Sequence, residues 1–338
     1  MRSNIAGNIL DAIGGTPIVR LQHFGAGLAP ALHAKIESMN PAGSMKDRSA
    51  LRMIEAAEAE HQLGPGAKIV IATSGNMGVG MAMVCAVKKF QLICLVDPKI
   101  PPATERCLET LGAKLVKVYK RDHTGGYHLT RLEKVEDVLA ENPGAVYLDQ
   151  YDSAANIDAH YSSTGPEILE GVGGQLAAIV MVAGTGGSSM GVARYFRQHA
   201  PDTDFWLVDE HGSLALAGND GSAPRFLNGM GTSIEPANYG GEGFRDYVDH
   251  VVYVDAAQAI DAAAQLARTE GILTGGTGGA ALHVMRNVAA AHYGPGDRLL
   301  ALLPDHGSRY MDTQFNKDWL TLQNIYVPTI YDDASEAD

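Results

Sequence analysis

The sequence predicts an α/β protein with two open, twisted sheets and a cleft between them. Along most of the chain, short apolar segments alternate with segments whose apolar residues recur at helical spacing, the pattern of repeated strand–helix units. Residues 177–182 (Ala-Ala-Ile-Val-Met-Val) are apolar throughout, as in a parallel strand covered on both faces. A chain of 338 residues is long enough for two such domains.

The first half of the chain contains mostly short strands. A short helical N-terminus comes first and is followed by a Gly-Gly-Thr-Pro turn at residues 14–17. Runs of β-branched and apolar residues predict the strands, and apolar residues three or four apart predict the helices. We expect strands at residues 18–21, 32–37, 68–72, 92–96, 114–118 and 146–148, and helices at 47–61, 76–88, 102–111 and 127–141.

The second half continues this alternation around a long loop. Residues 212–243 are rich in glycine and show no clear periodicity, which in a compact domain is typical of a binding loop or a lid. The patterns used for the first half predict strands at residues 176–183, 205–209, 251–254 and 298–303, and helices at 163–169, 192–199, 256–270 and 279–291.

The composition argues against several classes of partner. The net charge of −13 argues against nucleic acid, because binding phosphates requires a basic surface. No run approaches the ~18 apolar residues of a membrane helix, and the N-terminus lacks a signal-peptide core, so we expect a cytoplasmic protein without membrane contact. Cys85, Cys94 and Cys107 have no metal-ligand spacing, and we expect buried thiols and no metal site.

The stretch at residues 40–48 (Asn-Pro-Ala-Gly-Ser-Met-Lys-Asp-Arg) carries the first chemical signal. Gly43 and Ser44 suit a tight turn and an N-cap, which places Lys46 in the first helical turn. A cation at a helix N-terminus costs up to ~1 kcal/mol. The same field, with burial, lowers the pKa of the amine and favours Schiff-base chemistry with an aldehyde. A surface lysine after a loop would have the same local sequence, so only the other motifs can distinguish it from a Schiff-base lysine.

Three glycine-rich turns open predicted helices. Residues 184–188 (Gly-Thr-Gly-Gly-Ser) end the buried strand and would expose backbone N–H groups at the positive end of a helix, which suits phosphate. Residues 73–78 (Thr-Ser-Gly-Asn-Met-Gly) suit a carboxylate in the same way. Residues 275–280 (Gly-Gly-Thr-Gly-Gly-Ala) fit only a degenerate dinucleotide pattern. Taken singly, each turn could also be an ordinary helix start.

Taken together, these stretches resemble the ordered motifs of the fold-type II pyridoxal-phosphate enzymes, in the cysteine synthase branch. The resemblance extends from residues 13–17 (Ile-Gly-Gly-Thr-Pro) to residues 303–310 (Leu-Pro-Asp-His-Gly-Ser-Arg-Tyr). It implies two α/β domains with pyridoxal 5′-phosphate in the cleft between them, and a homodimer. The domains would be a larger cofactor-binding one, a smaller mobile one and an acidic tail: residues 1–45 with 155–330, residues 46–154, and residues 331–338.

The resemblance also implies a role for each matching residue. Lys46 would hold the cofactor as a Schiff base and then remove the substrate α-proton. Asn76 would bond the 3′-oxygen of the ring, and Thr277 would meet the ring nitrogen, where a neutral partner suits β-elimination and replacement. The phosphate would lie on Gly184, Thr185, Gly186, Gly187 and Ser188, and the substrate carboxylate on Thr73, Ser74, Gly75 and Gln150. Met77 stands beside them where cysteine synthases usually carry a hydroxyl residue.

Residues 96–100, 125–127 with 130–131, and 149–151 with 160–161 resemble one siderophore-pathway branch more than ordinary cysteine synthases. Members of that branch make N-(2-amino-2-carboxyethyl)-L-glutamate from O-phospho-L-serine and glutamate. The resemblance implies that Arg131 and Tyr151 bind the phosphate of phosphoserine and that Gly229 lies in a turn beside the nucleophile entrance. An arginine fork suits a phosphate leaving group better than a neutral ester. Arg131 could equally be a solvated helix residue, and the branch usually carries a hydroxyl residue where this chain has Gly184.

We therefore expect a pyridoxal-phosphate-dependent transferase that acts on small amino-acid substrates. It would eliminate the β-substituent of an activated L-serine to an aminoacrylate and add an amine such as L-glutamate, which would supply 2,3-diaminopropionate. Two alternatives stay open. One is a cysteine synthase that uses O-acetylserine or O-phosphoserine with sulfide, and the other is a non-catalytic protein that keeps the fold.

Overall fold

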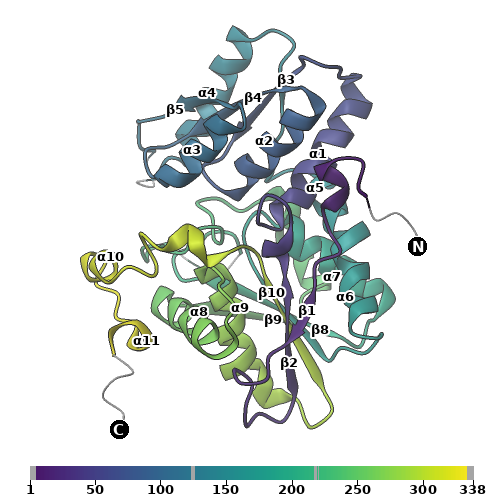
Figure 1. Ribbon diagram of the computed structural model, residues 1–338, viewed down its shortest axis with the longest axis vertical. Helices are drawn as coiled ribbons and strands as arrows, with labels where there is room; N and C mark the ends of the chain where they lie inside the picture. Colours follow the sequence, from purple (N-terminus) through teal and green to yellow (C-terminus); the bar gives the residue numbers. More distant parts are fainter. Residues whose placement is uncertain (1–4, 123–125, 217–218, 220, 333–338) are drawn as a thin grey trace.

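The computed structural model describes residues 5–122, 126–216, 219 and 221–332. It contains two sheets, a larger one and a smaller one, and Figure 1 shows the smaller sheet stacked above the larger with helices around both. The predicted α/β class with two parallel sheets is therefore confirmed. The strands of the smaller sheet come from one continuous part of the chain, whereas those of the larger come from both ends of it.

The larger sheet has six strands in the order β1-β2-β10-β7-β8-β9. Neighbouring strands are parallel except for β1, which runs antiparallel to β2. The strands are β1 (Ile18–Arg20), β2 (Ala31–Ile36), β7 (Ala178–Val182), β8 (Asp204–Glu210), β9 (His250–Val254) and β10 (Arg298–Leu303).

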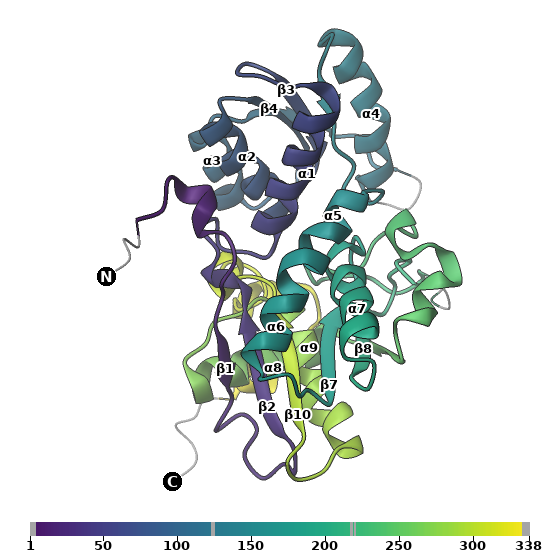
Figure 2. The same ribbon diagram turned by 90° about the vertical axis from the view of Figure 1, so that its right-hand side faces the viewer.

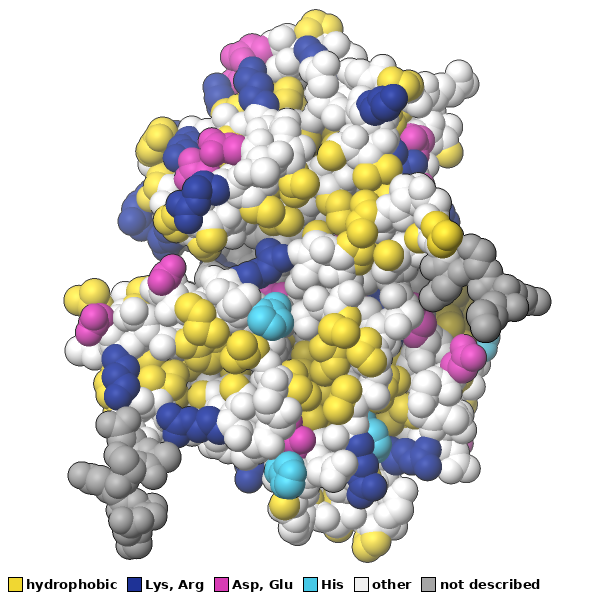
Figure 3. Space-filling model, in the orientation of Figure 1, with side chains coloured by type: hydrophobic (Ala, Val, Ile, Leu, Met, Phe, Trp, Pro, Cys, Tyr) yellow, Lys and Arg dark blue, Asp and Glu magenta, His cyan; other side chains and the backbone are white. Residues whose placement is uncertain are grey.

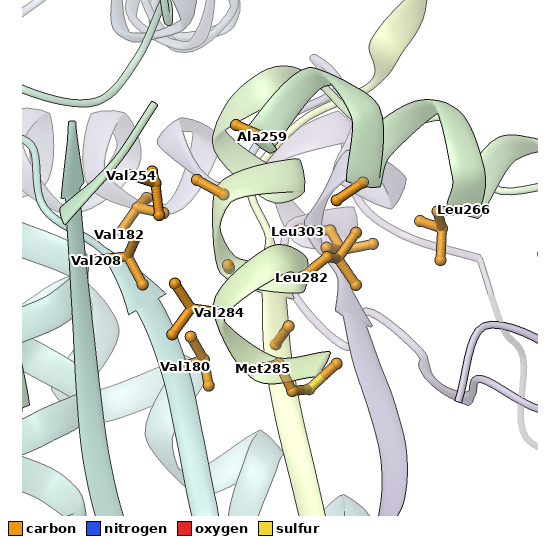
Figure 4. Close-up of a cluster of buried hydrophobic side chains, with 14 of the residues drawn as sticks. Val180, Val182, Val208, Val254, Ala259, Leu266, Leu282, Val284, Met285 and Leu303 are labelled. Carbon is orange, nitrogen blue, oxygen red and sulfur yellow. The ribbon is translucent and has the colours of Figure 1, made fainter. Parts of the chain in front are cut away.

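Helices cover both faces of the larger sheet. Helices α8 (Ala256–Glu270) and α9 (Gly276–Asn287) bury Val180 and Val182 of β7 on one face (Figure 4). Helix α7 (Gly187–His199), with α6 (Gly165–Gly171), covers the other face and buries Ile179 and Met181. Because successive strand residues point to opposite faces, β7 needs apolar side chains at every position, which explains its unbroken apolar run.

The smaller sheet has four parallel strands in the order β5-β4-β3-β6. Ile69 and Ile71 of β3 pack under α1, α2 and α3, while Val70 and Ala72 pack under α4. The elements are α1 (Lys46–His61), β3 (Lys68–Ala72), α2 (Asn76–Lys88), β4 (Gln91–Val96), α3 (Pro102–Thr110), β5 (Lys114–Lys117), α4 (His128–Glu141) and β6 (Val146–Tyr147).

Helix α5 (Ala154–Ala159) lies at the junction of the two parts, where it contacts both α1 and α7 (Figure 2). It continues through a π-helical turn, His160–Thr164, into α6. The sequence does not predict α5, nor does it predict α10 (Lys317–Leu322) or α11 (Pro328–Tyr331). Each of these helices is too short to show helical periodicity.

Several predicted helix ends are wrong. Helix α7 begins at Gly187 rather than residue 192, so the glycine turn forms its first turn. Helix α9 spans Gly276–Asn287 rather than 279–291. The N-cap of α1 is Met45, not Ser44, and its side chain makes no capping bond. Ser44 contributes instead by accepting the Lys46 N–H at 3.2 Å.

Other expectations concern the rest of the chain. Cys85 and Cys94 are buried free thiols, and Cys107 is half-buried. In the described part of the chain, no helix has the length and apolar character needed to span a bilayer, and no cluster of His, Cys, Asp and Glu could hold a metal ion. The division into domains stays a prediction, and residues 333–338 of the expected acidic tail lie outside the described residues.

Candidate active site

A cavity of about 320 Å³ lies between the two sheets, at the carboxyl ends of their parallel strands, where open parallel sheets bind ligands. Figure 3 shows the molecule hollowed between its upper and lower parts, with a basic side chain at the edge of the hollow. The cavity brings together most of the predicted site residues, namely Lys46, Thr73, Ser74, Gly75, Asn76, Met77, Arg131, Gln150, Tyr151, Gly184, Thr185, Gly229 and Thr277. Gly186, Gly187 and Ser188 do not line the cavity; they follow Thr185 at the start of α7.

Lys46 is the first residue of α1 and lines this cavity. Burial lowers the pKa of its amine to about 8, although the nearby Asp305 carboxylate acts in the opposite direction. A pKa near 8 leaves part of the amine unprotonated at neutral pH, and only the unprotonated amine attacks an aldehyde. Lys46 therefore has the environment that Schiff-base chemistry requires.

Arg48, two residues further along α1, fixes the start of this helix. Its guanidinium bonds Glu37 at 2.8 and 2.9 Å and Glu167 at 2.7 and 2.7 Å. Lys35 bonds Glu167 as well, at 2.8 Å. Burial acts to raise the pKa of Glu167, but Arg48 and Lys35 outweigh it and hold that pKa at about 2. This network, which we call the Arg48 clamp, connects the start of α1 to β2 of the larger sheet and to α6, which covers that sheet.

Asn76 opens α2 and is held on both sides of its amide. Its Nδ2 donates to Asp305 at 2.7 Å, and its Oδ1 accepts from Arg309 at 2.8 Å. Tyr310 donates to the same Asp305 oxygen at 2.5 Å. An amide nitrogen carries two N–H groups, so one remains available to a ligand in the cavity. Asp305, which is 1% exposed, therefore fixes the direction of that N–H.

The turn at residues 184–188 combines free backbone donors with tight packing. The first N–H groups of a helix have no intrahelical acceptor, so those at the start of α7 are available to an anion. Gly186 has φ +85°, and a Cβ there would lie 2.8 Å from Asn238. A Cβ on Gly187 would collide with Asn156. Gly186 is thus required by the backbone path and Gly187 by the packing of Asn156, and the turn suits a phosphate.

Two asparagines outside the predicted motifs hold this turn. Asn238 donates to the carbonyls of Thr185 at 2.7 Å and Gln150 at 2.8 Å. Asn156 donates to the same Gln150 carbonyl at 2.8 Å and to Thr185 Oγ1 at 3.4 Å. Nothing in the local sequence marks either residue, because each acts on a segment that is distant along the chain.

Thr277 lies in the first turn of α9 and lines the cavity. Its hydroxyl donates to the Asn228 carbonyl at 3.2 Å. The hydroxyl is a neutral group, and it is placed near the same space as Lys46 and Asn76. The amine, the oriented amide, the hydroxyl and the anion-binding turn together would hold an aromatic aldehyde that carries a phosphate.

Arg131 reaches the cavity from α4 and is not a solvated residue, so that alternative is wrong. Its side chain is 12% exposed and its Nη1 lies 2.9 Å from Asp97 Oδ2. The same Nη1 donates to Ser74 Oγ at 2.8 Å. Tyr151 lines the cavity nearby and packs its ring edge-on against His128, with ring centroids 4.6 Å apart.

The cavity is basic although the chain as a whole is acidic. Its lining includes Lys46, Lys99, Arg131 and Arg309 against Asp97 and Asp305, while the chain has a net charge of −13. Asp97, Lys99, Asp305 and Arg309 lie within residues 96–100 and 303–310, two stretches that resemble the family, but their roles depend on partners far away in the sequence. A local excess of positive charge attracts anionic ligands.

Comparisons with known proteins agree with this geometry. The family described as "Pyridoxal-phosphate dependent enzyme" matches residues 9–305. An N-(2-amino-2-carboxyethyl)-L-glutamate synthase of Ralstonia nicotianae is 37% identical over 94% of this chain and 91% of its own length. The enzyme of the same name from Cupriavidus metallidurans is 34% identical over 94% of this chain and 92% of its own.

Solved structures resemble the whole chain as well. The crystal structure of O-ureido-L-serine synthase has a TM-score of 0.82 and 33% identity, and the match covers 94% of this chain and 99% of that one. A hydrogen sulfide-producing enzyme from Fusobacterium nucleatum has a TM-score of 0.83 and 28% identity, over 90% of this chain and 100% of that one.

Proposed function

We propose substrates for this protein, which belongs to the pyridoxal-phosphate-dependent enzyme family and is an enzyme of the β-replacement type. The proposed reaction takes O-phospho-L-serine and L-glutamate and gives N-(2-amino-2-carboxyethyl)-L-glutamate and phosphate. In this reaction the Cβ–O bond of phosphoserine breaks and a bond from Cβ to the glutamate nitrogen forms. The relatives that carry this product in their names, at 37% and 34% identity over most of the chain, support it.

Pyridoxal phosphate, when bound, supplies an electron-withdrawing ring that acidifies the substrate Cα–H and allows the β-substituent to leave. The residues of this chain fit it. Lys46 provides the amine that holds the aldehyde and, once released, accepts the Cα proton at Nζ. The turn at residues 184–188 binds the phosphate, and Asn76 and Thr277 orient the ring through its oxygen and its nitrogen. Asp305, by bonding Asn76 at 2.7 Å, keeps that amide aimed.

The remaining residues would bind the amino acid itself. The Thr73 hydroxyl, the Ser74 backbone N–H and Gln150, all from residues that line the cavity, would bind the α-carboxylate. Arg131 and Lys99, with Tyr151, would receive the phosphate leaving group. The nucleophile would enter past Gly229, which also lines the cavity.

The observation that carries the choice of phosphoserine is the placement of Arg131. Its guanidinium lines the cavity that holds Lys46, in a chain whose net charge would otherwise repel a polyanionic substrate. A phosphate would form charge-assisted bonds with the Arg131 donors that Asp97 leaves free, whereas a neutral acetyl ester would form only a weaker one.

The test is a product assay on purified protein loaded with cofactor. O-Phospho-L-serine and L-glutamate should give inorganic phosphate and a product of the expected mass, with O-acetyl-L-serine a much poorer donor. Arg131→Met should remove the preference for phosphoserine, while the matched variant Arg197→Met, which alters an arginine outside the cavity, should keep it. Equal use of both donors by the unmodified enzyme would contradict the proposal.

A second candidate is cysteine synthesis from an activated serine and sulfide. The likeness to the hydrogen sulfide-producing enzyme, at 28% identity and a TM-score of 0.83, favours it. Rapid cysteine formation with sulfide, and no condensation product with glutamate, would establish this function in place of the first.

A cytoplasmic homodimer completes the proposal. In that dimer, a second copy would cover exposed apolar side chains such as Ile9 (48%), Met39 (66%) or Met311 (42%). Sedimentation of the purified protein would check the dimer, and cell fractionation would check the location.

A further inference from the structure

We propose that Asp97 sets how tightly Arg131 holds an oxyanion and, through Ser74, links that anion to the loop that binds the substrate carboxylate. Asp97 is then a specificity-determining and positioning residue. This inference rests on the proposed function in one respect, because it takes the phosphate of the β-substrate as the anion.

Asp97 follows β4 and is held in one orientation. Its Oδ1 accepts the Lys99 N–H at 2.9 Å, and its Oδ2 accepts from Ser74 Oγ at 2.8 Å and from Arg131 Nη1 at 2.9 Å. The residue is 7% exposed. Turning this carboxylate away would break all three bonds, so it stays beside Arg131 when a ligand enters.

The Ser74 hydroxyl has no proton left for a substrate. A hydroxyl donates one hydrogen bond and accepts two. Ser74 Oγ donates to Asp97 Oδ2 at 2.8 Å, and it accepts from the Asp97 N–H at 3.0 Å and from Arg131 Nη1 at 2.8 Å. Ser74 therefore holds its loop in place against Asp97 and Arg131, and the substrate carboxylate would be bound by other donors of the loop, such as the Thr73 hydroxyl.

Arg131 keeps part of its binding capacity. Of its nitrogens only Nη1 bonds another described residue, and the buried Nε has no partner among them. A phosphate placed on the free edge would meet one positive charge and, close by, the negative charge of Asp97. Repulsion in a partly buried site weakens such binding substantially. A site of this kind accepts phosphate from the substrate and also releases it, as each turnover requires.

The experiment measures the binding of inorganic phosphate to cofactor-loaded protein by titration calorimetry. Cofactor loading matters because it fills the turn at residues 184–188. Asp97→Asn should bind phosphate about tenfold or more tightly than the unmodified enzyme, because the competing charge is gone. The matched control Asp249→Asn removes one negative charge outside the cavity and should stay within about twofold. A purely structural role for Asp97 would weaken phosphate binding, so unchanged or weaker binding overturns the proposal.

A second variant separates charge from geometry. Asp97→Glu keeps the charge but displaces the carboxylate, so phosphate affinity should stay near that of the unmodified enzyme. The affinity for L-alanine, followed by the cofactor absorbance, should fall because Ser74 loses its partner. Tighter phosphate binding by Asp97→Glu would overturn the role of charge, and unchanged L-alanine affinity would overturn the role of Ser74.

Glutarate serves as the other anion, since a dicarboxylate nucleophile could also meet Arg131. If Asp97→Asn tightens glutarate and not phosphate, the assignment of this site to the leaving group falls. The outcome is independent of the product assay. Phosphate affinity can rise in Asp97→Asn even if the enzyme uses another donor, and the product can form even if phosphate affinity does not change.

Discussion

Arg48 and Arg131 are both largely buried arginines paired with carboxylates, but the protein uses them differently. Arg48, 2% exposed, makes four bonds to two carboxylates. Arg131, 12% exposed, pairs with one carboxylate through one nitrogen and lines the cavity. An arginine with all its donors satisfied holds parts of the fold together, whereas one with donors left over is available to a ligand.

Loss of the Arg48 clamp should give the largest change in stability. Arg48→Met would leave the buried Glu37 and the half-buried Glu167 without their main partner, and breaking a buried pair in this way costs about 3–5 kcal/mol. Chemical denaturation of the two proteins would measure the difference. A cost below about 1 kcal/mol would show that Arg48 is no more structural than a surface arginine.

Acid should weaken the same clamp over a defined range. The pKa of Glu167 is lowered from 4.5 to about 2, so its contribution to stability is fully present above about pH 4.5 and is lost as the pH falls toward 2. The shift corresponds to about 3 kcal/mol. Denaturation of the unmodified enzyme and of Glu167→Gln between pH 5 and pH 2.5 should show their stability difference shrinking. A difference that is independent of pH would rule this linkage out.

Loss of Arg131 should instead change function. Arg131→Met should raise the KM for O-phospho-L-serine about 10- to 100-fold, the worth of a lost charge-assisted hydrogen bond. Initial rates across a range of phosphoserine concentrations would measure it, with Arg131→Lys expected to recover part of the loss. If the variant is mainly destabilised and its KM is unchanged, Arg131 has a structural role like that of Arg48.

The smallest change in stability should come from an exposed ion pair, although its contact is shorter than those of Arg48. Arg245 lies 2.5 Å from Glu242, but the two side chains are 54% and 68% exposed. Arg245→Met should change the free energy of unfolding by no more than about 0.5 kcal/mol. A larger loss in chemical denaturation would mean that distance, rather than burial, determines the worth of these pairs.

The sequence predicts the helices, the strands and the local motifs better than it predicts contacts between residues that are distant along the chain. Lys46 and the turn at residues 184–188 carry local signals, a lysine at a helix start and glycines after a buried strand. Arg48 and Arg131 carry none that tells them apart, because Glu37, Glu167 and Asp97 approach them only in the folded chain. The roles of Asn156 and Asn238 could not be predicted for the same reason. Ser74 looks like a ligand-binding hydroxyl until its hydrogen bonds to Asp97 and Arg131 are known.

The place of β10 in the larger sheet has a consequence for how the chain folds as it is synthesised. Strand β10 lies between β2 and β7 and pairs with both, so the sheet stays in two separate pieces until residues 298–303 have left the ribosome. The strands of the smaller sheet all lie between residues 68 and 147 and can pair much earlier. The smaller sheet can therefore form first, whereas the Met45 N–H, beside Lys46, gains its acceptor, the Pro304 carbonyl at 2.8 Å, only after the residues that follow β10 have been made.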